Sequence, residues 1–342
     1  MADTMWAKRL AGPGRFETVA VPAPAVGDLP DGHVLLRVLA GGICGSDIPY
    51  FRGVHPLPQI NNLHGRYSAE LAGFPMHEVV GEVLGSRHPG VEVGSRVVGW
   101  ARGMNGLAEL VITRGDSVAE YDAGLDPTTA VMLQPLACVL GAVPQLADVA
   151  GSTVAVIGQG PIGLLFSHVL SSLGAARVTG VDRVPRDDVA ARFGVDEAIH
   201  ASSDWWAGSL DAEADRPAII VEAVGHQVRT LTDAIQAAGQ GGQIFYFGIP
   251  DDPVYPMPMS DFLRKNLRLT SGVTRDRRDA LRQASAYLAR HPDLRSSYIT
   301  DVFGVADAEQ AYARAALPAR GRLKVVLAMD ADWGQGRAPH DL

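Results

Sequence analysis

Residues 154–163 read Val-Ala-Val-Ile-Gly-Gln-Gly-Pro-Ile-Gly, a short apolar run followed at once by the spacing Gly-x-Gly-x-x-Gly. This order predicts a strand, a tight turn and a helix. Gly158 would permit the turn, Gly160 would let the backbone approach a pyrophosphate, and Gly163 would let helix and strand pack closely. The pattern therefore predicts a dinucleotide site, although a glycine turn of this spacing also occurs without a nucleotide.

The helix is predicted from the residues that follow the turn. Its N-terminus would present unpaired N–H groups to the phosphates of a bound nucleotide, so Pro161 and Ile162 count among the expected cofactor-binding positions. Gly174 suits its C-terminal end. The apolar positions recur at the spacing of one buried face: Ile162, Phe166, Val169, Leu170 and Leu173.

An acidic residue follows at the distance that nucleotide recognition requires. The next predicted strand, residues 177–181, runs into Asp182, which lies 19 residues after Gly163. A carboxylate about 20 residues on binds a ribose 2′-hydroxyl and repels a 2′-phosphate. We therefore expect NAD rather than NADP, with Arg183 beside the ribose. Arg183 keeps NADP open, and Asp182 as a simple helix cap is the other interpretation.

Two more predicted strands extend the same pattern. Residues 218–224 are followed by Gly225, and residues 243–247 by Gly248. The carboxyl ends of parallel strands meet at the crevice where such sheets bind ligands. Both glycines would leave room for a nicotinamide, and Ala223 and Val224 would lie beside it. Ordinary turns at strand ends explain each glycine equally well.

The texture of the sequence divides the chain into two domains. Residues 1–147 consist of short strands and turns punctuated by glycine and proline, which is typical of a compact β unit. Residues 148–277 alternate apolar strands with helical patterns and predict a parallel sheet with crossover helices. Residues 278–342 are too few for a third domain, and we expect them to join the first. The expected fold class is therefore α/β.

Composition excludes several classes of partner. The 342 residues are 47% hydrophobic, with a formal net charge of −8 and no long basic block, so nucleic acid is not an expected partner. No run of 18 apolar residues occurs, which argues against a membrane span. The N-terminus lacks the features of a signal peptide, and two cysteines make no disulfide scaffold. A cytoplasmic protein is the default expectation.

Two short stretches carry residues that could hold a metal. Residues 44–47 read Cys-Gly-Ser-Asp, and residues 76–78 read Met-His-Glu. A thiolate and an imidazole are both good zinc ligands, and a catalytic zinc site takes three protein ligands and keeps one position open. By themselves, Cys44 and His77 are better explained as a buried cysteine and a structural histidine.

Taken together with the glycine fingerprint, these stretches give the chain a specific resemblance. It resembles the medium-chain dehydrogenase/reductase family, in its zinc-dependent polyol, sorbitol and sugar dehydrogenase branch, over about residues 5–330. The resemblance implies a GroES-like β-rich catalytic domain and a Rossmann domain with a doubly wound parallel sheet. Its anchors are residues 44–47, 77–78, 134–138 and 158–163.

The resemblance also implies roles for individual residues. Ser46 would relay the alcohol proton, and Asp47 would hydrogen-bond the zinc-bound histidine. It implies one catalytic zinc and, with only two cysteines, no structural zinc. The expected ligands are Cys44, His77, Glu78 and Gln134.

The chain departs from the family pattern at three positions. Gln134 stands where the family usually has Glu or Cys, and a neutral amide is a poorer zinc ligand. Pro49 stands where polyol dehydrogenases often have a relay histidine, and Met76 replaces a glycine. These departures put the strength of zinc binding in question.

The segment between the two metal-binding stretches is the expected substrate loop. Residues 50–72 are long for a connection and carry Tyr50, His55 and His64. Their donors and acceptors suit a substrate with many hydroxyl groups, and a solvated surface loop is the alternative.

These observations predict a zinc-assisted, NAD-dependent dehydrogenase that acts on a secondary alcohol of a polyol, sugar or aminocyclitol-like substrate. The resemblance implies a homodimer or homotetramer joined through the apolar strand at residues 267–270. Two alternatives remain: a zinc-free, NADPH-dependent enone or quinone reductase on the same fold, and a non-catalytic relative.

Overall fold

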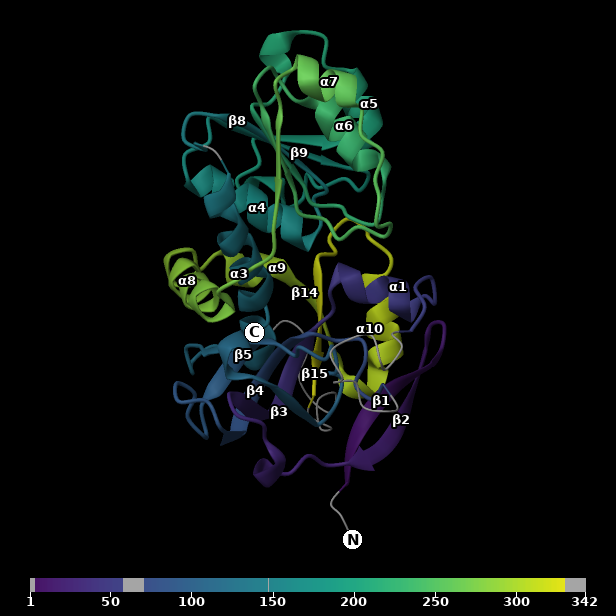
Figure 1. Ribbon diagram of the computed structural model, residues 1–342, viewed down its shortest axis with the longest axis vertical. Coiled ribbons are helices and arrows are strands. Elements are labelled where there is room, and N and C mark those ends of the chain that lie inside the picture. The colour runs from purple at the N-terminus through teal and green to yellow at the C-terminus, as the bar shows by residue number, and fades with distance from the viewer. Residues whose placement is uncertain (1–3, 58–70, 147, 330–342) are drawn as a thin grey trace. The chain divides into compact units, whose positions relative to one another are not determined.

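The computed structural model describes residues 4–57, 71–146 and 148–329 (Figure 1). The chain forms two compact units. Unit 1 comprises Met1–Ala137, Asp276–Leu317 and Arg322–Leu342, and unit 2 comprises Cys138–Arg275 and Pro318–Gly321. The domain boundaries expected from the sequence lie at 147/148 and 277/278.

Unit 1 is built mainly from antiparallel strands. Within the described residues, seven strands form a sheet in the order β14-β15-β3-β4-β5-β7, with β6 on β3, and β1 and β2 form a separate hairpin. The strands are β1 (Thr4–Gly12), β2 (Arg15–Pro22), β3 (His33–Gly42), β4 (Glu78–Ser86), β5 (Arg96–Trp100), β6 (Leu110–Arg114), β7 (Val118–Glu120), β14 (Ile299–Gly304) and β15 (Lys324–Ala328).

Short helices connect and cover this sheet. The α-helices are α1 (Ile48–Phe51), α2 (Pro127–Ala130), α3 (Leu133–Ala142, which continues into unit 2), α8 (Arg277–Arg290), α9 (Leu294–Tyr298) and α10 (Ala308–Ala315). The 3₁₀ turns are η1 (Val26–Asp28), η2 (Gly45–Asp47), η3 (Gly115–Ser117) and η7 (Val305–Asp307).

The register of the sheet brings three distant segments together. Gly42, the last residue of β3, pairs with Glu78 at the start of β4 and with Val326 of β15. A Cβ atom at Gly42 would lie 2.3 Å from Glu78 Oε2 and 2.6 Å from Val131 Cγ1, so only glycine fits there. The end of β3 and the starts of β4 and β15 therefore lie close enough to share one site.

Unit 2 contains a parallel sheet. Its six strands follow the order β10-β9-β8-β11-β12-β13, and every neighbouring pair is parallel. This is the doubly wound order, in which the chain reverses direction across the sheet between β8 and β11. The strands are β8 (Thr153–Ile157), β9 (Arg177–Asp182), β10 (Glu197–His200), β11 (Ile219–Glu222), β12 (Gln243–Tyr246) and β13 (Arg268–Ser271).

Helices cover both faces of this sheet (Figure 1). Ile244 packs in the core that α6 shares, whereas the next residue, Phe245, stacks toward Phe166 of α4. This alternation along β12 is the strand period of two, with both faces apolar. The helices are α4 (Pro161–Ser172), α5 (Ser203–Gly208), α6 (Arg229–Ala237) and α7 (Met259–Arg264), with 3₁₀ turns η4 (Val143–Gln145), η5 (Ala190–Phe193) and η6 (Glu213–Asp215).

The predicted α/β class is confirmed, and some strand ends differ from expectation. The strand expected over residues 218–224 ends at Glu222, because the Glu222 side chain accepts the N–H groups of Val224 and Gly225 and closes a turn there. Ala223 and Val224 therefore belong to the turn after β11.

One segment is long and apolar enough to be compared with a membrane helix. Pro127–Gln145 has a mean hydropathy of 1.3, yet 61% of it is buried inside the fold. Burial of this kind is what the core helix of a folded domain shows, so length and composition alone are weak evidence for a membrane span.

Candidate functional site

The β3–β4 pairing places the two metal-binding stretches side by side. Cys44 follows β3 by two residues, and His77 directly precedes β4, whose first residue pairs with the last residue of β3. One ligand atom from each of Cys44, His77 and Glu78 lies within 4.8 Å of the others. Sulfur, imidazole nitrogen and carboxylate oxygen are zinc ligands, so the three residues can hold one ion.

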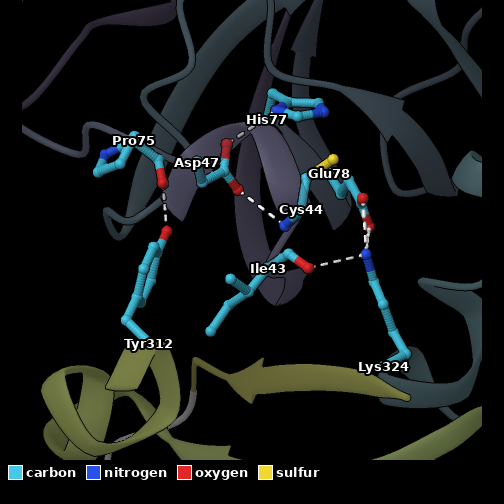
Figure 2. A network of polar contacts seen from close by, with 8 residues as sticks. All are labelled: Ile43, Cys44, Asp47, Pro75, His77, Glu78, Tyr312 and Lys324. Carbon is cyan, nitrogen blue, oxygen red and sulfur yellow. Dashed lines mark hydrogen bonds and ion pairs between the residues drawn. The ribbon is translucent and has the colours of Figure 1, made fainter. Parts of the chain in front are cut away.

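Asp47 joins both stretches (Figure 2). It is completely buried, with Oδ1 3.1 Å from His77 Nδ1 and Oδ2 accepting the N–H of Cys44 at 2.9 Å. Because a carboxylate only accepts hydrogen bonds, His77 Nδ1 must carry the proton, which leaves Nε2 for a metal.

The charges around Asp47 shift two titrations. Burial lowers the pKa of His77, but the charge and hydrogen bonds of Asp47 and Cys44 outweigh it and hold that pKa well above its ordinary value. Burial raises the pKa of Asp47, which His77 and the Cys44 N–H partly offset. Without an ion these contacts favour the protonated imidazole, so a metal ion competes with that proton for His77.

Lys324 is a site residue that the sequence did not reveal. Its ammonium donates to Glu78 Oε1 at 2.6 Å and to the carbonyl oxygen of Ile43 at 3.0 Å. The side chains of Lys324 and Glu78 are almost fully buried. Figure 2 shows Lys324 reaching from the start of β15 to Glu78. Burial lowers the pKa of Lys324, but the charges of Glu78, Cys44 and Asp47 and the hydrogen bond to Glu78 together outweigh burial, so the pKa is raised. A single lysine in the apolar run 323–328 was the available signal.

Tyr312 contacts the segment that leads to His77 and Glu78, and the sequence did not reveal this residue either. Its hydroxyl donates to the carbonyl oxygen of Pro75 (Figure 2). Its ring packs against Phe16 and Phe51. The contact fixes the backbone two residues before His77, so Tyr312 supports the position of that ligand.

The remaining predicted residues of this site lie as follows. Ser46 is partly exposed in the turn η2, between Cys44 and Asp47. Gln134 is buried in α3, one helical turn beyond Val131, whose side chain contacts the space at Gly42. Gln134 therefore belongs to a third segment of the chain and stays a proposed ligand.

The expected substrate loop is described only at its two ends. Tyr50 lies in α1, and its ring is T-shaped against both Phe74 and His55, at 4.9 Å and 5.4 Å between centroids. Burial, followed by the charge of Asp47, raises the pKa of Tyr50. Tyr50 and His55 thus lie near the segment that leads to His77, and His64 lies outside the described residues.

The glycine fingerprint in unit 2 has the conformation that its spacing predicts. Gly158 has a φ of +89°, in the left-handed region, and its N–H donates to Val181 O at 2.8 Å. A Cβ at Gly163 would lie 1.7 Å from the carbonyl oxygen of Gly158, whereas a Cβ at Gly160 would meet open space. Strand and helix therefore touch at Gly163, and the backbone at Gly160 is accessible where Pro161 and Ile162 begin α4.

Asp182 lies against this turn. Its carboxylate accepts the N–H of Gln159 at 2.6 Å and that of Val184 at 2.7 Å. Arg183 is exposed and donates to Gln227 at 2.7 Å. A cavity of about 200 Å³ adjoins Asp182, lined among others by Pro185, Arg186, Ile199 and His200.

The two turns that were expected to face a nicotinamide also meet. The N–H of His226 donates to Ile249 O at 2.8 Å, and a Cβ at Gly248 would lie 2.2 Å from the nitrogen of Gly225. Ala223, Val224, Gly225 and Gly248 are therefore adjacent, at the carboxyl ends of β11 and β12.

Comparison with known proteins is consistent with both units. Residues 30–132 match the family described as an alcohol dehydrogenase GroES-like domain, and residues 161–290 match the family described as zinc-binding dehydrogenase. The expected pair of domain folds is thereby confirmed.

Individual relatives are distant. Sorbitol dehydrogenase of Halalkalibacterium halodurans is 30% identical over 55% of this chain and 60% of its own length. D-altritol 5-dehydrogenase of Agrobacterium fabrum is 29% identical over 74% of this chain and 80% of its own. A solved structure of a short chain alcohol dehydrogenase from E. coli CFT073, complexed with NADH, superposes with a TM-score of 0.79 at 21% identity, over 95% of this chain and 99% of that one.

Proposed function

We propose a function from the premise that this chain belongs to the zinc-dependent medium-chain dehydrogenase family, in its polyol-type branch. The chain oxidises a secondary alcohol of a polyol, sugar or aminocyclitol-like substrate with NAD, or runs the reverse reduction. The observation that carries the proposal is the convergence of Cys44, His77 and Glu78 within 4.8 Å. The sorbitol and D-altritol dehydrogenases among its relatives support the substrate class.

The residues present fit a zinc ion. Cys44, His77 and Glu78 would hold it, and Gln134 is the further candidate ligand. With Cys44 as thiolate and His77 neutral, the negative charges of Cys44, Asp47 and Glu78 exceed the positive charge of Lys324 by two, which a divalent ion balances. When bound, zinc supplies a Lewis acid that lowers the pKa of an alcohol.

The chain's own residues handle the proton and the orientation of the ligands. Asp47 holds His77 with its Nε2 available. Ser46, partly exposed beside Cys44, takes the proton of the alcohol and passes it to solvent. A bound nicotinamide would supply the hydride acceptor, so that oxidation of the alcohol to a ketone would be balanced by reduction of NAD to NADH.

Unit 2 would bind the cofactor. Residues 158–163 and the N-terminus of α4 would bind the pyrophosphate, and Asp182 would accept the ribose 2′-hydroxyl. The Asp182 carboxylate is held by two backbone N–H groups, so it cannot easily turn away from a 2′-phosphate that it repels. The repulsion between Asp182 and a 2′-phosphate favours NAD over NADP. Arg183, the next residue, would lie on the solvent side of the Asp182 carboxylate.

Tyr50, His55 and His64 are proposed to contact the substrate, through donors and acceptors suited to hydroxyl groups. The zinc-free, NADPH-dependent reductase alternative does not need the Asp47–His77 contact or a thiolate beside it. The non-catalytic alternative would retain nucleotide binding without turnover.

A homodimer or homotetramer in the cytoplasm completes the proposal. The edge strand β13 and the residues after it expose Leu269 and Val273, which suits pairing with a second copy. Within the part of the chain that the structure describes, Cys44 and Cys138 form no disulfide, which fits a reducing compartment.

The test is a screen of NAD reduction against polyols, sugars, aminocyclitols and simple alcohols, with zinc content measured on the same sample. Turnover of a polyhydroxylated secondary alcohol by zinc-containing protein is expected. Reduction of enones by NADPH in zinc-free protein would instead select the alternative.

A further inference from the structure

Glu222 is a completely buried carboxylate that neither the glycine fingerprint nor the metal site uses. It ends β11, whose other residues, Ile219–Val221, are apolar and pair with β8 on one side and β12 on the other. A carboxylate in such a place is unfavourable unless hydrogen-bond donors surround it. Its contacts therefore indicate why the chain keeps it.

Glu222 holds two separate turns. Its side-chain Oε1 accepts the N–H of Val224 at 3.1 Å and that of Gly225 at 3.2 Å. Its backbone carbonyl oxygen accepts the N–H of Phe247 at 2.9 Å and that of Gly248 at 3.1 Å. One residue thus fixes both the turn after β11 and the turn after β12.

The carboxylate also fills the space beneath the two turns. A Cβ at Gly248 would lie 2.5 Å from Glu222 Oε2, and a Cβ at Gly225 would lie 2.6 Å from the nitrogen of Ile249. No side chain fits between the two turns and the Glu222 carboxylate. A change in Glu222 should therefore shift the backbone of both turns.

The donors around the carboxyl group oppose its desolvation. Burial raises the pKa of Glu222, while the Thr230 hydroxyl and the N–H groups of Gly225, Val224 and Gly248 around the carboxyl group lower it. Thr230 is itself buried in the first turn of α6. The helix and both turns therefore converge on this one carboxyl group.

The strand order indicates which part of a dinucleotide these turns would face. Asp182 ends β9, on one side of the fingerprint strand β8, and Glu222 ends β11, on the other side. In a doubly wound sheet the two mononucleotide halves bind on opposite sides of the strand that carries the fingerprint. The adenosine half belongs to the side of Asp182, and the nicotinamide half to the side of Glu222.

We infer that Glu222 is the positioning residue for the nicotinamide half of the bound cofactor, acting through the turns at residues 223–225 and 247–249. The inference rests on the proposed function, because it requires that the chain bind a nicotinamide dinucleotide. Glu222 does not contact the cofactor, so its replacement should affect only ligands that carry a nicotinamide.

The experiment compares NADH with ADP-ribose, which shares the adenosine, both phosphates and the second ribose but lacks the nicotinamide. In Glu222→Gln, calorimetric titration should show the Kd for NADH raised about tenfold, while that for ADP-ribose changes less than about twofold. Asp182→Ala should weaken both ligands. Glu197→Gln, an exposed carboxylate in the same unit, should weaken neither.

Equal weakening of both ligands in Glu222→Gln, or weakening of neither, would overturn the inference. If that variant does not fold, Thr230→Val provides the same test, because it removes the hydroxyl group that lowers the pKa of the carboxyl group and should weaken NADH selectively but less. If the unmutated protein binds ADP-ribose but Thr230→Val shows no selectivity, the inference fails alone. If the unmutated protein binds neither ligand, the proposed function fails as well.

Discussion

The Lys324 ammonium lies 2.6 Å from the Glu78 carboxylate, and both side chains are at most 3% exposed. The same ammonium donates to the carbonyl oxygen of Ile43, the residue before Cys44. Lys324 therefore ties together the two stretches that carry Cys44 and His77. The positive charge of Lys324 also offsets the negative charge of Glu78, which would otherwise be buried without a partner charge when no metal is bound.

Replacing Lys324 should destabilise the protein in the absence of metal. Lys324→Met leaves Glu78 buried without its partner, and breaking a buried ion pair from one side costs about 3–5 kcal/mol. Urea unfolding in the presence of a chelator measures the loss. The double variant Lys324→Met/Glu78→Gln should recover part of it, because no uncompensated charge remains. Equal unfolding free energies for the unmutated protein and Lys324→Met would contradict this account of the pair.

Asp47→Asn should weaken zinc binding without removing a ligand. An amide carries no charge to favour the orientation of His77, and loss of such a partner typically lowers metal affinity about 10–100-fold. Competition with a chromophoric chelator measures the affinity. Asp116→Asn is the matched control, since Asp116 pairs with Arg114 at the surface. Unchanged affinity in Asp47→Asn would show that the contact does not support the ligand.

Cofactor preference should follow Asp182. The unmutated protein should have a higher kcat/KM with NAD than with NADP, and Asp182→Ala should erode that preference. Because the carboxylate also holds the backbone of Gln159 and Val184, Asp182→Asn serves as a control that keeps hydrogen-bond acceptance while removing the charge. If NAD and NADP are used equally well before mutation, Asp182 does not select the cofactor.

Assembly should depend on the edge of the parallel sheet. Sedimentation at micromolar concentration should give a dimer or tetramer, and Val273→Asp should shift it toward the monomer, because it places a charge on an apolar contact. Leu317→Asp, at another exposed apolar position but in unit 1, is the control and should leave the mass unchanged. A mass near 36.2 kDa for the unmutated protein would rule out the oligomer.

The parts of the site that are local in sequence could be predicted. The conformation at Gly158 and the contact at Gly163 follow from glycine spacing within one turn, and Asp182 follows from a fixed spacing along one βαβ unit. Cys44 and His77 had meaning only together with the fingerprint, since a lone cysteine and a lone histidine carry little information.

The parts that depend on long-range register could not be predicted. Lys324 reaches Glu78 across 246 residues, and Tyr312 reaches Pro75 across 237. The Lys324 contact exists because β15 returns to pair with β3, and Tyr312 lies in α10, which packs against β15. No short-range pattern specifies either contact. Glu222 was hidden for a different reason. Its strand was expected to continue to residue 224, whereas its own side chain ends the strand.

The central claim is that a metal ion held by Cys44, His77 and Glu78 is required for alcohol oxidation. The direct measurement is elemental analysis beside NAD reduction, before chelation, after chelation and after zinc is restored, with Cys44→Ser as the variant that removes a ligand. The account predicts about one zinc per chain, loss of turnover on chelation, recovery with zinc, and no recovery in Cys44→Ser. Full turnover in a sample shown to be free of zinc would contradict it.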